Sequence, residues 1–104
     1  MNSRSRRFVS LSLAAVAFIS GCNTYPEVAS REAISLIAAL RTACNTKSPQ
    51  RLDRVNQSIE RAHANGTLSP HEHAAFADIV SLARNGQWQD AEYACADFQE
   101  AQIR

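Results

Sequence analysis

The segment "LSPHEH", Leu68–His73, predicts the start of a helix and shows which signals divide the chain into helices. Ser69 is a residue typical of N-caps, and Pro70 suits the first helical position, where its missing amide hydrogen is not needed. Glu72 stands three residues after Ser69, so the two can form a capping box in which each side chain accepts a hydrogen bond from the other's backbone amide. We therefore predict a helix that begins at Pro70 and ends at Asn85-Gly86.

Similar signals divide the rest of the chain into helices. Ser48 and Pro49 predict a helix start, and Asn65-Gly66 predicts the end of that helix. An earlier helix is expected from about Glu27 to Cys44, and a last one from near Gln87. In all four segments, apolar residues recur every three or four positions, as on one face of a helix: Ala33, Ile37, Leu40, Cys44; Leu52, Val55, Ile59, Ala62; Phe76, Ile79, Val80, Ala83; Trp88, Ala91, Cys95, Phe98.

The sequence therefore predicts an all-α fold over residues 27–104. No alternating pattern is long enough to indicate a strand. Short connections between amphipathic helices favour antiparallel neighbours, so we expect a compact four-helix domain, either an up-down bundle or two stacked helical hairpins. Leu82–Ala94 loosely resembles the hinge of a tetratricopeptide repeat, but one partial match falls short of the roughly three repeats that a solenoid needs.

The first residues have a different character. Arg4, Arg6 and Arg7 precede Phe8–Ile19, which contains no charge, glycine or proline. Twelve helical residues span roughly 18 Å, less than the ~30 Å hydrocarbon core of a bilayer. A cationic start followed by a short apolar run is typical of a secretory signal peptide.

This signal ends in Ile19-Ser20-Gly21-Cys22, which resembles the lipobox of bacterial lipoproteins. The resemblance implies that residues 1–21 are removed, that Cys22 receives a diacylglycerol thioether and fatty acyl chains such as palmitate, and that residues 22–26 form a short tether. Asn23 is not the aspartate that retains such proteins in the inner membrane, so we expect an outer-membrane anchor facing the periplasm. An ordinary cleavage site at Ala15-Val16-Ala17, with Cys22 unmodified, is the alternative.

Two further cysteines remain once Cys22 is assigned to lipid. Cys44 and Cys95 both lie on the apolar faces of the first and last helices, which are neighbours in a bundle. An even number of cysteines in an exported protein of this size favours a disulfide. Two buried free thiols are the alternative reading.

Composition excludes some functions. The chain from Cys22 to Arg104 has 83 residues, with eight basic and ten acidic side chains and a formal net charge of −2. Such a domain lacks the basic surface that binds nucleic acid or anionic headgroups. We find no catalytic motif and no glycine-rich phosphate loop, so we expect no enzyme activity and no cofactor.

The histidines offer the one pattern with possible metal chemistry. His71 and His73 flank Glu72, and His63 ends the preceding helix. On a helix, residues two apart point about 200° from each other, so His71 and His73 do not face one ligand. The sequence therefore favours capping at Glu72 over metal binding. We expect a lipid-anchored envelope protein whose helical domain is an interaction or structural module, with a metal- or small-ligand-binding domain as the alternative.

Overall fold

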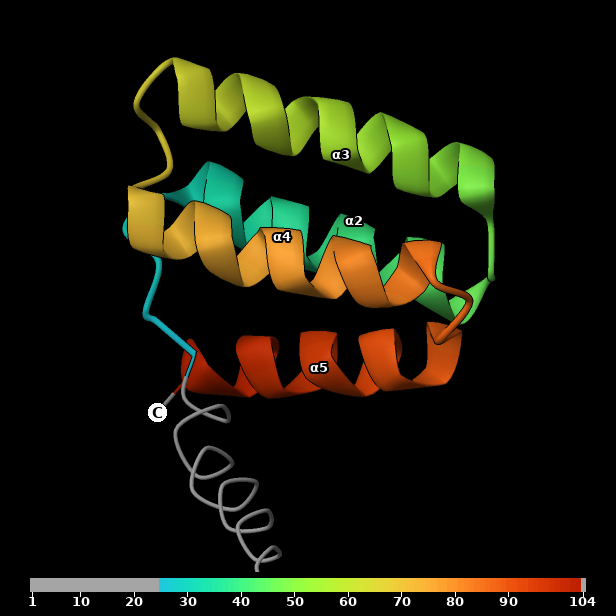
Figure 1. Ribbon diagram of the computed structural model, residues 1–104. Helices are drawn as coiled ribbons and strands as arrows, with labels where there is room; N and C mark the ends of the chain where they lie inside the picture. Colours follow the sequence, from blue (N-terminus) through green and yellow to red (C-terminus); the bar gives the residue numbers. More distant parts are fainter. Residues whose placement is uncertain (1–24, 104) are drawn as a thin grey trace, which may run out of the picture.

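The computed structural model describes residues 25–103. Its helices, labelled as in Figure 1, are α2 (Arg31–Asn45), α3 (Pro49–Ala64), α4 (Pro70–Arg84) and α5 (Trp88–Ala101). No strand occurs between residues 25 and 103. The predicted all-α, four-helix domain is confirmed.

The four helices form an up-down bundle. Each helix runs antiparallel to the one before it, and α5 returns beside α2 (Figure 1). The contact of α2 with α5 is the most extensive, whereas α3 and α5 do not touch. Every helix therefore has two main neighbours, as in a closed ring, and this arrangement decides between the two architectures that the sequence left open.

The predicted caps at Ser48 and Ser69 are present. The Ser48 hydroxyl accepts a hydrogen bond from the Arg51 amide at 3.1 Å. Ser69 accepts one from the Glu72 amide at 3.0 Å, and Glu72 Oε1 accepts one from the Ser69 amide at 2.9 Å. This reciprocal pair is the capping box expected from "LSPHEH".

The first helix begins later than predicted. It starts at Arg31 rather than near Glu27, because Ser30 is its N-cap and accepts a hydrogen bond from the Ala33 amide at 3.0 Å. The residues before Ser30 lie outside the helix and bond to distant parts of the domain. The helical pattern of the sequence therefore extended one turn too far.

We call residues 25–30 the N-terminal strap. The Gln102 side chain accepts a hydrogen bond from the Val28 amide at 2.8 Å and donates one to the Pro26 carbonyl at 2.8 Å. Glu72 Oε2 accepts a third from the Ala29 amide at 3.0 Å. These bonds hold the strap against α4 and the end of α5.

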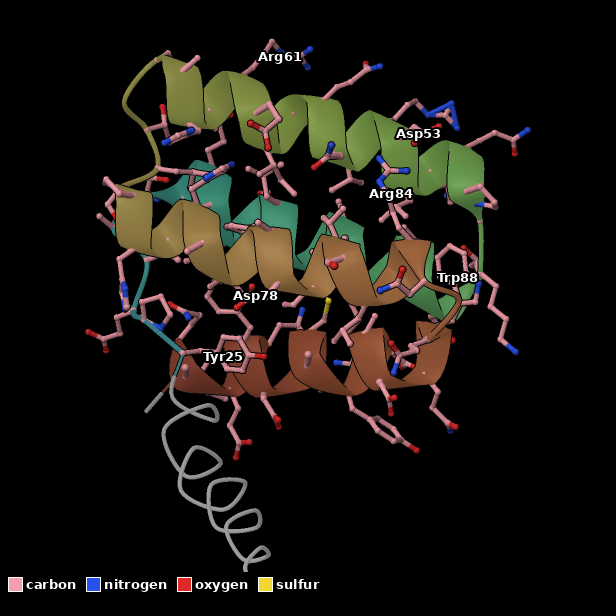
Figure 2. All side chains as sticks on the ribbon, in the orientation of Figure 1. Tyr25, Asp53, Arg61, Asp78, Arg84 and Trp88 are labelled. Atoms are coloured by element: carbon pink, nitrogen blue, oxygen red, sulfur yellow. The ribbon has the colours of Figure 1, made fainter. Side chains whose placement is uncertain are left out.

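The bundle interior is built around two phenylalanines. Phe76 and Phe98 are fully buried, with ring centroids 5.1 Å apart. Tyr25 also stacks on Phe98, with ring centroids 5.1 Å apart, and lies beside α5 in Figure 2. The predicted apolar positions are buried except Val55 and Trp88, which are only partly covered and pack at the edge of the core. Trp88 lies at the turn between α4 and α5 (Figure 2).

Candidate functional site

His63 and His73 meet at one end of the bundle. His63 lies in the last turn of α3, and His73 lies in the first turns of α4. Their imidazole rings stack with centroids 3.8 Å apart and planes 5° from parallel. Both residues are partly buried, so the rings are partly shielded from water. The structure thus joins two of the three histidines considered as ligands.

Glu60 completes the cluster. Its Oε2 lies 2.9 Å from Nε2 of His73. One ligand atom from each of Glu60, His63 and His73 can be chosen so that all three lie within 4.8 Å of one another. Because Glu60 precedes His63 by three residues, both project from one face of α3. The spacing Glu-x-x-His was visible in the sequence, but only the packing of α4 brings His73 to it.

The short loop between α3 and α4 fixes this geometry. Asn65 Oδ1 accepts hydrogen bonds from the Thr67 amide at 3.0 Å and the Thr67 hydroxyl at 2.6 Å. Gly66 has a φ of +86°, a conformation that side chains disfavour. Leu68 is buried in the core. The end of α3 and the start of α4 are therefore held by local bonds and by core packing.

His71 and Glu72 do not join the cluster. His71 is exposed, as expected for a residue two positions from His73 on a helix. Glu72 is buried and bonds to the Ser69 and Ala29 amides. The interpretation of Glu72 as a capping residue is confirmed, and His71 is placed away from the candidate ligands.

Cys44 and Cys95 face each other in the core between α2 and α5. Both are buried, and they lie 4.4 Å apart without a bond between their sulfurs. Interaction with the Cys95 thiol lowers the pKa of Cys44, whereas the same interaction and burial raise the pKa of Cys95. The side chains are thus close neighbours, and the disulfide stays a prediction.

An open groove lies between α2 and α5. Its volume is ≈480 Å³. Three isoleucines, at positions 34, 37 and 103, supply most of its apolar lining together with Ala96, and Arg41 and Glu100 are among the polar residues around it. Ile34 is 50% exposed and Ile103 is 81% exposed. Tyr93, the other large exposed apolar side chain in the described residues, lies on α5 and accepts a hydrogen bond from Gln89.

The predicted lipidation site, Cys22, lies outside the described residues. From residue 25 to residue 103, no helix is long and apolar enough to cross a bilayer. No family model matches the chain, and no match was found among curated proteins or solved structures.

Proposed function

We propose that this chain is a bacterial lipoprotein, held in the cell envelope by acyl chains on Cys22, with the four-helix bundle acting as an interaction module beside the membrane. The sequence Ile19-Ser20-Gly21-Cys22 carries this proposal. Two or more acyl chains anchor a protein stably, whereas one chain binds only marginally. Asn23 favours the periplasmic face of the outer membrane.

The strap supports a close attachment. Tyr25 stacks on Phe98, and Pro26 bonds to Gln102, so the chain is already fixed to the bundle three residues after Cys22. Three residues reach at most about 11 Å. A lipidated Cys22 would therefore keep the end of the bundle that carries the start of α2 and the end of α5 next to the bilayer.

The groove between α2 and α5 is the surface best suited to a protein partner. Contiguous exposed apolar surface often marks an interaction site, whereas single exposed apolar side chains do not. Ile34 and Ile103 are both exposed and line the same groove. Both residues lie at the end of the bundle that carries the strap. We propose that this groove binds an apolar segment of another envelope protein that is anchored in the same membrane.

Metabolic labelling tests the anchor. A palmitate analogue fed to the native host should label the wild-type protein and leave Cys22→Ala unlabelled. Cys95→Ala is the matched control, because it removes another cysteine and should keep the label. Equal labelling of the wild type and Cys22→Ala would contradict the proposal.

In-cell photo-crosslinking tests the groove separately. A photoreactive residue at position 34 should give a discrete protein adduct that is lost when Ile103→Glu is added. Position 57 is the control, because Gln57 is exposed on α3, which does not contact α5. The same adducts from both positions, or an adduct insensitive to Ile103→Glu, would argue against this surface.

A further inference from the structure

We propose that Glu60, His63 and His73 form a binding site for a divalent transition metal ion of the Zn²⁺ type. The site uses two helices, with Glu60 and His63 from α3 and His73 from α4. The site involves neither Cys22 nor the groove between α2 and α5. Its test is therefore independent of the test of the lipid anchor.

The ligand set matches this class of ion. Two imidazoles and one carboxylate are common ligands of zinc, and a site with three protein ligands leaves a position for water. Hard cations such as Mg²⁺ prefer all-oxygen surroundings, and imidazole suits Zn²⁺ and its neighbours in the first transition row. The pair of histidines therefore selects against Mg²⁺.

The distances are close to those of a metal centre. Zinc bonds to nitrogen and oxygen are about 2.0–2.2 Å long, which places tetrahedral ligand atoms about 3.3 Å apart. Here the three ligand atoms lie within 4.8 Å of one another. Side-chain movements that bring the ligand atoms up to about 1.5 Å closer together would give that spacing.

The stacked rings must tilt for this to happen. The lone pair of an imidazole lies in the plane of its ring, and two nearly parallel planes do not meet at one ion. The 5° stack of His63 on His73 is therefore not yet a coordinating arrangement. The ion would take the place of the hydrogen that now joins His73 Nε2 to Glu60 Oε2 at 2.9 Å. Metal binding should therefore replace both the stack and this hydrogen bond, which makes it visible at the rings themselves.

The surroundings favour binding without refolding. The loop that joins the two helices is fixed by Asn65 and by the capping box at Ser69. The His73 side chain is 23% exposed and Glu60 is 53% exposed, so an ion can reach the site from solvent. Arg61, next to Glu60, points away from the bundle (Figure 2) and donates a hydrogen bond to Ser58.

Isothermal titration calorimetry tests the proposal on the full mature chain in detergent micelles. The protein is stripped with a chelator and carries no histidine tag, since a tag would bind the same ion. Zn²⁺ should bind with a stoichiometry of one, and Mg²⁺ at the same concentration should give no heat. His63→Ala and His73→Ala should each weaken Zn²⁺ binding by at least about tenfold, and Glu60→Gln should weaken it as well.

His71→Ala is the matched control, because it removes a histidine two positions from His73 that lies outside the cluster. It should bind Zn²⁺ as the wild type does. The helical circular dichroism signal verifies that each variant is folded. NMR of the histidine rings in the unsubstituted protein gives an independent result, because Zn²⁺ should shift the ring signals of His63 and His73 but not those of His71. Absent heat in the wild type, equal loss in His71→Ala, or shifts at His71 alone would overturn the proposal.

Discussion

The Glu72 carboxylate joins the Ser69 amide of the α4 cap to the Ala29 amide of the N-terminal strap. One oxygen accepts the first hydrogen bond at 2.9 Å and the other accepts the second at 3.0 Å. The side chain is buried, with 6% exposure. A local capping signal therefore also serves as a tertiary contact that fixes the residues leading from the predicted anchor.

Replacing Glu72 should cost more than the loss of an ordinary cap. Glu72→Ala leaves two partly buried amides without their charged acceptor, and we expect the free energy of unfolding to fall by about 2–3 kcal/mol. Glu32→Ala removes an exposed carboxylate from the first turn of α2 and should cost less than about 1 kcal/mol. Urea denaturation measures both. Equal losses would contradict a stabilising role for the two hydrogen bonds that Glu72 accepts.

The caps at Ser48 and Ser69 were predictable because their signals are local. The contacts of the N-terminal strap were not predictable, because its partners are distant in the sequence. Ser69 and Glu72 are three residues apart and satisfy each other's amides. By contrast, Val28 bonds to Gln102, 74 residues away. The prediction extended the first helix back to Glu27 because the apolar spacing continues there and the local cap signal at Ser30 was not used. The hydrogen bond from Val28 to Gln102 is a tertiary contact that no helical pattern reveals.

Gln102 should control how firmly the strap is held. Gln102→Ala removes its bonds to Val28 and Pro26, and we expect a loss of about 1–2 kcal/mol together with faster hydrogen exchange at the Val28 amide. Gln57→Ala, at an exposed position on α3, should leave both quantities unchanged. Unchanged exchange at Val28 in Gln102→Ala would contradict the assigned role.

Two isoleucines on α2 provide a matched test of the core. Ile37 is 1% exposed and Ile34 is 50% exposed. Ile37→Ala should lower the free energy of unfolding by about 2–5 kcal/mol through lost burial and a residual cavity. Ile34→Ala should lower it by less than about 1 kcal/mol. Chemical denaturation of both variants measures the two losses in the free energy of unfolding. Similar losses would contradict the finding that α2 buries Ile37 in the core and leaves Ile34 exposed.

The cysteine pair should be oxidised in protein taken from the envelope of the native host. Free-thiol counting should then find no free thiol at Cys44 or Cys95, and reduction should lower the free energy of unfolding by up to ~4 kcal/mol for a loop of about 50 residues. The double variant Cys44→Ala, Cys95→Ala should not respond to reductant. Two free thiols in the envelope form would contradict the disulfide.

Once reduced, the pair should react slowly with alkylating agents. Cys95 is buried and its pKa is raised, so near neutral pH it carries almost no thiolate, the reactive form. Cys44 has a lowered pKa, yet burial hides it from the reagent. Mass spectrometry should find both residues unmodified in the folded protein and modified after unfolding.

The proposed metal site at Glu60, His63 and His73 was only partly predictable from the sequence. His63 and His73 were recognisable as candidates because they flank the loop between α3 and α4. The contribution of Glu60 depended on its three-residue spacing from His63, and the choice of His73 over His71 depended on how α4 rotates against α3. Helix faces can be deduced from spacing, whereas the contact between two polar edges is set by packing of the apolar faces.

The mass of the mature protein from its native host tests the central claim most directly. The account predicts a chain that begins at Cys22 and carries fatty acyl adducts on that residue. A chain that begins elsewhere, with an unmodified thiol at Cys22, would contradict the envelope anchor.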